Sequence, residues 1–132
     1  MIVVDTSVWI AAARKPSGPD ATTLQSLIDF DEVALALPVR MELMAGIAKK
    51  DRRAFARGLS ALPILAPTEE TWVIAESWIQ PAAEAGFRFA VTDLLIAAVT
   101  AEIGGLVWSL DDDFRHMEQL GFAKRYVEKG DG

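Results

Sequence analysis

The chain contains no cysteine among its 132 residues. Disulfide bonds and thiolate metal ligands are therefore excluded, and the absence favours the reducing cytoplasm as its location. A single histidine, His116, is expected to be structural rather than a catalytic base. Positive charge is also scarce, because 13 Lys and Arg residues face 19 Asp and Glu residues and leave a net charge of −6. Sequence-independent binding of nucleic acid would then require a local basic patch, a metal ion, or both.

The sequence also lacks an uninterrupted apolar segment of membrane-spanning length. Its longest candidate, "FAVTDLLIAAVTAEIGGLVW", contains Asp93, Glu102 and two adjacent glycines. This segment predicts a buried helix followed by a strand. The first apolar stretch has no basic leader and contains Asp5, so we expect no signal peptide and no membrane contact.

Aliphatic residues dominate what is present: the chain is 52% hydrophobic but only 8% aromatic. Its length suits one domain, spanning residues 1–132, with one core. The pattern predicts strands at 1–5, 32–37, 62–67, 106–110 and 123–128, and helices at 6–15, 22–30, 38–50, 49–58, 68–86, 91–105 and 111–121. Because strands and helices alternate, we expect an α/β fold: a central, mostly parallel sheet of four to five strands with helices on both faces.

Local signals predict where several helices begin and end. Pro38 suits a first helical turn, and Thr68 is an N-cap for the helix at 68–86, which Pro81 should kink or split. Thr92 is expected to cap the helix at 91–105, which closes at two glycines.

Four acids stand among apolar neighbours: Asp5, Glu42, Asp93 and Asp111. Asp5 and Asp111 each follow a strand, and the carboxyl ends of parallel strands meet at one edge of a sheet, where α/β folds bind ligands. Asp93 begins a helix and Glu42 lies about one turn into another, so both can reach the same crevice. Clustered carboxylates raise one another's pKa, and a hard cation such as Mg²⁺ or Mn²⁺ relieves that repulsion. The predicted chemistry is metal-assisted hydrolysis of a phosphodiester.

Three of these acids also have purely structural interpretations. Asp5 could be a helix N-cap, Asp93 a first-turn acid favoured by the helix dipole, and Asp111 a solvated cap within a run of three acids. Glu42 lies on a helix face of Met and Leu residues that gives it no obvious structural role. The set of four is therefore more informative than any single member.

Four segments carry a family resemblance: "VVDTSVWI", "PVRMELMAG", "VTDLLIAAVTAE" and "WSLDDDF". In this order and spacing, over essentially the whole chain, the sequence resembles the PIN-domain ribonucleases, and among them the VapC-type toxins of bacterial toxin–antitoxin pairs. The third segment is similar to the family's Asp-x-Leu-Ile-Ala-Ala helix. The fourth is similar to its Thr-x-Asp-x-Asp-Phe segment, with Ser109 in place of the common Thr.

This resemblance implies a Mg²⁺- or Mn²⁺-dependent endoribonuclease with Asp5, Glu42, Asp93 and Asp111 as metal ligands. Asp113 would be an auxiliary acid. Ser7 or Thr6 would orient Asp5, and Ser109 would keep the hydroxyl that the family has at this position. The resemblance further implies an RNA substrate, a VapB-type antitoxin as inhibitor, and a homodimer.

Two other features have two readings each. A basic run that includes Lys49, Lys50, Arg52 and Arg53 is either a solvated helix or a patch that contacts RNA phosphates. Trp72, Ala75 and Ile79 lie at helical spacing and could form a dimer or antitoxin contact.

Three rival functions fit the acids less well. A receiver-like module would need an adjacent acid pair after the first strand and a lysine after a later one, and "VVDTS" and "VWSLDD" offer neither. A haloacid-dehalogenase-type phosphatase would need an Asp-x-Asp opening. A PIN-like protein that only binds a partner would not need the intact set of four acids.

Overall fold

The computed structural model describes residues 1–128, and its centre is a five-stranded sheet in the order β3-β2-β1-β4-β5. All neighbouring strands pair in parallel. The strands are short: β1 (Ile2–Val4), β2 (Val33–Ala36), β3 (Ile64–Leu65), β4 (Leu106–Trp108) and β5 (Lys124–Arg125). The sheet confirms the predicted α/β architecture, and all five predicted strands are present in shortened form.

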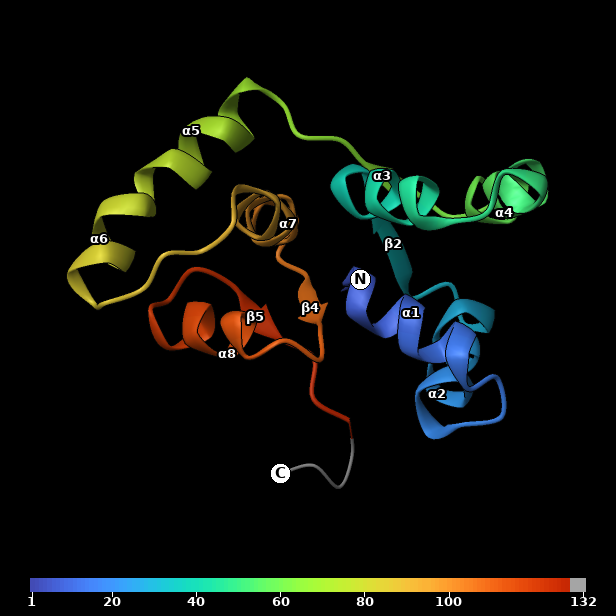
Figure 1. The fold of residues 1–132 in the computed structure, drawn as a ribbon. Helices are drawn as coiled ribbons and strands as arrows, with labels where there is room; N and C mark the ends of the chain where they lie inside the picture. The colour runs from blue at the N-terminus through green and yellow to red at the C-terminus, as the bar shows by residue number, and fades with distance from the viewer. Residues whose placement is uncertain (129–132) are drawn as a thin grey trace.

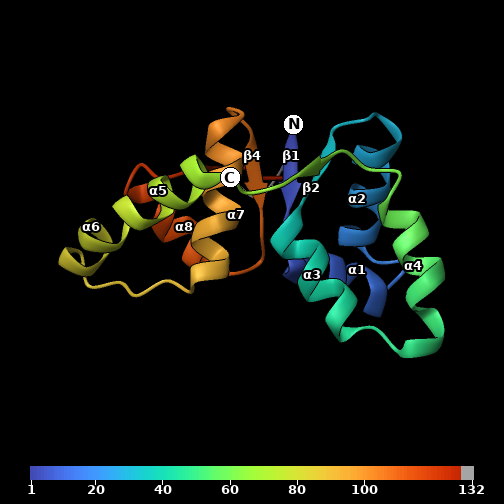
Figure 2. The same ribbon diagram turned by 90° about the horizontal axis from the view of Figure 1, so that it is seen from above.

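Helices connect the strands and cover the sheet (Figures 1 and 2). In chain order they are α1 (Thr6–Arg14), α2 (Pro19–Asp29), α3 (Leu37–Gly46), the 3₁₀ turn η1 (Lys49–Asp51), α4 (Arg52–Leu59), α5 (Glu69–Ser77), α6 (Ile79–Glu84), α7 (Val91–Glu102) and α8 (Asp112–Gln119). In Figure 2, α1 to α4 gather on one side of the molecule and α5 to α8 on the other.

The two faces of the sheet are packed into separate apolar layers. Val3 and Val107 belong to a cluster with residues of α3, α5, α7 and α8. Ile2, Val4 and Trp108 belong to a second cluster with residues of α1 and α2. Side chains alternate between the faces of a strand, so burial of successive residues requires cover on both faces. This is the arrangement expected from the continuous apolar strands.

The structure confirms most of the predicted helix caps and breaks, but one predicted cap is wrong. Thr68 accepts a hydrogen bond from the Thr71 amide at the start of α5, and the predicted long helix is split at Trp78 into α5 and α6, with Pro81 in the first turn of α6. Thr92 does not cap α7, because that helix already begins at Val91 and its N-cap position is Ala90. At the other end of α7, Gly104 adopts a φ of +64°, the left-handed conformation that ends many helices.

The strand order also bears on the rival functions. Receiver modules have the order 2-1-3-4-5, which differs from the order β3-β2-β1-β4-β5 found here. From β1 the chain continues to β2 and β3 on one side, and then crosses to β4 on the other. The carboxyl ends of β1 and β4 therefore flank the switch in strand order, the place where open α/β sheets bind ligands. Among residues 1–128, no helix is long and apolar enough to cross a membrane.

Candidate active site

Asp5 follows β1 directly and is buried, with 5% of its surface exposed. It occupies the N-cap position of α1, but its side chain makes no capping hydrogen bond. Instead, Oδ2 of Asp5 accepts hydrogen bonds from the hydroxyls of Ser7 at 2.8 Å and Ser109 at 2.7 Å. Helix capping thus accounts for the backbone position of Asp5 and not for its carboxylate.

The two serine hydroxyls join the ends of β1 and β4. Ser7 Oγ accepts a hydrogen bond from the Leu110 amide at 3.0 Å, and Ser109 Oγ accepts one from the Asp111 amide at 3.0 Å. The Asp5 amide in turn donates to the Trp108 carbonyl at 2.8 Å. The orientation of the Asp5 carboxylate is therefore linked to the backbone position of the next acid, Asp111.

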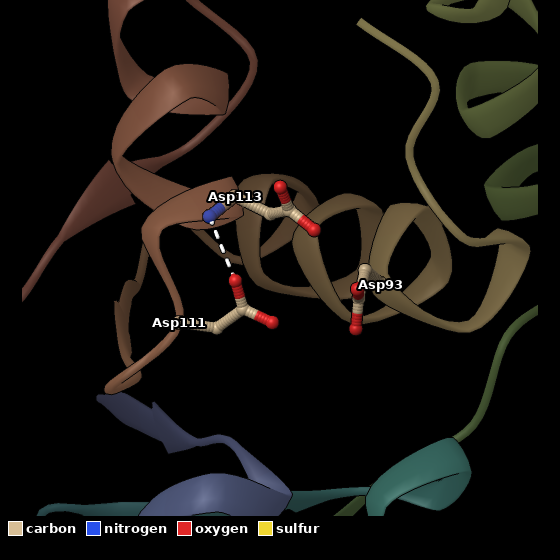
Figure 3. Close-up of side chains that lie close together, drawn as sticks. All are labelled: Asp93, Asp111 and Asp113. Atoms are coloured by element: carbon tan, nitrogen blue, oxygen red, sulfur yellow. Dashed lines mark hydrogen bonds between the residues drawn. The ribbon is translucent and has the colours of Figure 1, made fainter.

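Asp93, Asp111 and Asp113 form a close group in which one carboxylate oxygen from each lies within 4.8 Å of the others. Asp93 lies in the first turn of α7, and the other two lie at the start of α8. Figure 3 shows the three side chains around a common space, with the Asp113 amide donating to Oδ1 of Asp111 at 2.9 Å. Asp111 thus does cap α8, as its structural interpretation predicts, and its carboxylate also faces the other two acids.

The electrostatics show that the acids act on one another. Burial raises the pKa of Asp93 to about 7, with further contributions from the charges of Asp5, Asp111, Asp113 and Glu42. Burial and the charge of Asp111 also raise the pKa of Asp113. All four predicted acids and the auxiliary Asp113 therefore lie near enough to interact at one edge of the sheet.

Glu42 lies on α3 and is exposed. Its Oε1 accepts a hydrogen bond from the Thr6 hydroxyl at 2.9 Å. The sequence predicts that Ser7 or Thr6 orients Asp5. In the structure Ser7 does so, whereas Thr6 contacts Glu42, an acid from a different element.

The donor set fits a hard divalent cation. Its groups are carboxylate oxygens, the ligands that Mg²⁺ and Mn²⁺ prefer. The pKa of Asp93 is raised to about 7 because the side chain is partly buried and because its charge is unfavourable beside the other acids. A cation at this position would remove that penalty, so Asp93, Asp111 and Asp113 could hold one between them, with Asp5 and Glu42 beside them.

The predicted basic residues lie elsewhere. Lys49 and Lys50 are on η1, Arg52 and Arg53 begin α4, and all four are exposed. Figure 2 places α4 on the side of the molecule opposite α7 and α8. The structure therefore does not bring this run into the group of acids.

The apolar face predicted around α5 is interrupted. Ala75 is buried, while Trp72 and Ile79 are half exposed on either side of the break at Trp78. His116 is half-buried, and its ring stacks on Phe87 with centroids 4.5 Å apart.

The sequence did not reveal a large groove of about 1050 Å³ between α1, α2, α3 and α4. Its apolar lining includes Trp9, Leu24, Phe30, Leu43 and Phe55, and Glu42 lies on its wall. Phe30 is 76% exposed. The sequence offered no direct signal for this groove, because it forms only when the four helices pack against one another.

Solved structures share this architecture. A chain of VapBC2 from Rickettsia felis, solved bound to promoter DNA, aligns with a TM-score of 0.77 at 17% identity, covering 96% of this chain and 98% of that one. A chain of VapBC-5 from Mycobacterium tuberculosis aligns with a TM-score of 0.66 at 26% identity, covering 94% and 97%. VapC20 from the same organism, a toxin that cleaves the Sarcin-Ricin loop, aligns with a TM-score of 0.64 at 19% identity, covering 88% and 94%.

No curated protein matches the chain. The sequence model of the PIN domain matches residues 2–120, which include all the acids described above. The strand order, the acids at the switch in that order and this match agree with the resemblance seen in the sequence, and the chain belongs to the PIN domain family.

Proposed function

We propose that this protein is a metal-dependent endoribonuclease and the toxin of a toxin–antitoxin pair. The observation that carries the proposal is the close group of Asp93, Asp111 and Asp113 beside Asp5 and Glu42, at the switch in strand order of a PIN domain. VapC20, which has the same fold, is an RNA-cleaving toxin. The nuclease unit is proposed to comprise the whole chain, residues 1–132, in the cytoplasm.

The acids would hold Mg²⁺ or Mn²⁺ and orient the RNA backbone around it. The proposed ligands are Asp93 and Asp111 of the close group, together with Asp5 and Glu42 beside it; Asp113, the third member of the close group, is the proposed auxiliary acid. When bound, the cation would activate a water for attack on phosphorus and neutralise charge that develops there. Ser7 and Ser109 both donate to Oδ2 of Asp5, and Oδ1, which has no hydrogen bond to another side chain among residues 1–128, is the proposed ligand atom.

Replacement of single acids tests the site. Purified Asp5→Asn and Asp93→Asn proteins should lose at least ~100-fold of their cleavage rate on total RNA in Mn²⁺ or Mg²⁺, because each loses a ligand charge but almost no volume. Asp112→Asn is the matched control: Asp112 neighbours two of the acids, but it pairs with Arg115 at 3.6 Å and lies outside the close group.

Cleavage by wild type in EDTA, or an unchanged rate in Asp5→Asn, would contradict the proposal. Metal binding without cleavage of any RNA would instead support a PIN domain that only binds a partner. Circular dichroism of each variant establishes that the fold is intact.

A VapB-type antitoxin is the proposed partner. Solved structures of the same fold are VapBC and FitAB complexes. The groove between α1, α2, α3 and α4 has the apolar lining that an amphipathic segment of such a protein would bury. A short reading frame for a DNA-binding protein next to this gene would encode the candidate. The half-exposed Trp72 and Ile79 are proposed to lie in a homodimer interface.

A further inference from the structure

Thr6 and Ser7, the first residues of α1, direct their hydroxyls to two different acids. Ser7 donates to Oδ2 of Asp5, and Thr6 donates to Oε1 of Glu42 at 2.9 Å. Asp5 is buried at the end of β1, whereas Glu42 is exposed on α3. A single helical turn therefore contacts carboxylates from two separate elements.

Glu42 needs such a contact more than the other acids do. A glutamate has three side-chain torsions, and ordering a long exposed side chain costs conformational entropy. Glu42 is also exposed and lies outside the close group of Asp93, Asp111 and Asp113. Without a fixed contact, this carboxylate would spend much of its time in solvent.

The Thr6 hydroxyl supplies that contact and occupies only one oxygen. With Oε1 bound to Thr6, Oε2 of Glu42 stays available, just as the two serines leave Oδ1 of Asp5 available. Thr6 is β-branched and in a helix, so its own side chain has few rotamers. It also lies directly after Asp5, so its position is set by the same strand end.

We propose that Thr6 is a positioning residue of the metal site: its hydroxyl holds the Glu42 carboxylate in place to bind the cation. This inference rests on the proposed function of the same site. Partners that orient metal ligands typically contribute 10–100-fold to metal affinity or activity. Thr6 itself contacts neither the cation nor the substrate.

Mn²⁺ binding to the purified metal-free protein tests the role without relying on cleavage. Thr6→Val keeps the shape of the side chain and removes the hydroxyl, so it should raise the Kd for MnCl₂ about 10-fold in calorimetry. Thr6→Ser restores the hydroxyl and should bind within about 3-fold of wild type, the loss reflecting its freer rotation. Cleavage rates should show the same order at limiting MnCl₂ and converge at saturation.

Thr22→Val is the matched control, because the Thr22 hydroxyl bonds only to the Gly18 carbonyl within α2 among the described residues. Its Kd for MnCl₂ should equal that of wild type. The double variant Thr6→Val/Glu42→Gln should bind Mn²⁺ no more weakly than Glu42→Gln alone, since Thr6 acts through Glu42.

The outcomes separate the two proposals. If wild type binds Mn²⁺ and cuts RNA but Thr6→Val binds as tightly, the role of Thr6 is wrong and the proposed function stands. If Thr6→Val weakens Mn²⁺ binding by the Glu42→Gln protein as much as it weakens Mn²⁺ binding by wild type, Thr6 does not act through Glu42 and the inference fails. If wild type neither binds Mn²⁺ nor cuts RNA, both fail. Thermal unfolding of each variant shows whether a loss of Mn²⁺ binding reflects misfolding. Thr6→Ser, which keeps the hydroxyl, should unfold as wild type does.

Discussion

At the scale of single residues, the acids of the site have very different surroundings. Asp5 is buried, and two hydroxyl groups donate hydrogen bonds to one of its oxygens. Asp93 is half-buried among other carboxylates, and its pKa rises to about 7. One site therefore contains a buried acid that is held by two hydroxyl groups and another whose charge is unfavourable unless a cation is present.

This cost makes the stability of the metal-free protein depend on pH. The pKa of Asp93 lies near 7 in the folded state and near 3.8 when the chain is unfolded, so its protonated form favours folding. That contribution is complete below pH 3.8 and is lost as the pH rises through 7. In EDTA, raising the pH from 5 to 8 should destabilise wild type relative to Asp93→Asn by roughly 1–2 kcal/mol, a figure reduced for partial exposure to solvent.

Urea unfolding of both proteins at several pH values measures the difference. MnCl₂ should restore the stability of wild type at pH 8 and have less effect on Asp93→Asn. A difference between the two proteins that stays constant from pH 5 to 8 would show that Asp93 does not have the raised pKa.

The sequence predicted the main acids of this site but not their contacts. Asp5 and Asp111 were predictable because they follow strands, and parallel strands bring their ends to one edge. The pairing of Thr6 with Glu42 was not predictable. The two residues are 36 positions apart in the sequence, and their contact depends on how α3 packs against α1. The nearness of Asp113 to Asp93 likewise depends on the distance between α7 and α8.

At the scale of elements, β1 and β4 lie unusually close at their amino ends. A Cβ atom on Gly105 would lie 2.8 Å from the Met1 carbonyl oxygen, and that oxygen also accepts a hydrogen bond from the Leu106 amide. Glycine is therefore needed where β4 begins, for lack of space rather than for its φ angle.

Gly105→Ala should destabilise the protein by about 1–3 kcal/mol, because backbone atoms must move apart to admit the methyl group. The contrasting control is Gly58→Ala in α4, where a Cβ would meet nothing within 4 Å. That substitution should stabilise by about 0.5–1 kcal/mol, as expected for alanine in a helix. Thermal unfolding reports both; equal effects of the two substitutions would mean that the close approach is not rigid.

Element types were more predictable than element ends. Sequence patterns located all the strands and the helical segments among residues 1–128, with α5 and α6 predicted as one helix that Pro81 should kink or split, whereas Thr92 was a wrong cap for α7. A capping side chain is one of several ways to begin a helix, and here the backbone turns at Ala90 without one. The groove between four helices was beyond prediction, since it depends on their relative angles.

At the scale of the whole molecule, the clustered acidic residues and the basic run lie on separate parts of the protein. The chain has a net charge of −6, and its acidic group lies apart from the basic residues of η1 and α4. An RNA attracted by the basic residues would have to extend across α3 to reach the acids. Binding and cleavage should therefore respond to different substitutions.

Replacement of Lys49, Lys50, Arg52 and Arg53 by Gln should raise the KM for RNA at least ~5-fold at low salt and leave kcat unchanged. Each lost phosphate contact should also reduce the slope of log affinity against log salt by about 0.7. The double variant Lys15→Gln/Lys124→Gln, which removes exposed charge elsewhere, is the control. Steady-state cleavage at several salt concentrations measures both quantities, and an unchanged salt slope would assign the basic run to a solvated helix.

The hydrogen bonds between Ser7, Ser109 and Asp5 join positions more than one hundred residues apart, since Ser7 and Ser109 are separated by 102. The site therefore cannot form while only the first hundred residues of the chain have left the ribosome. It forms only once β4 has been synthesised and has inserted beside β1. Synthesis would therefore have to pass β4 before the proposed nuclease site could form beside the RNA of the ribosome.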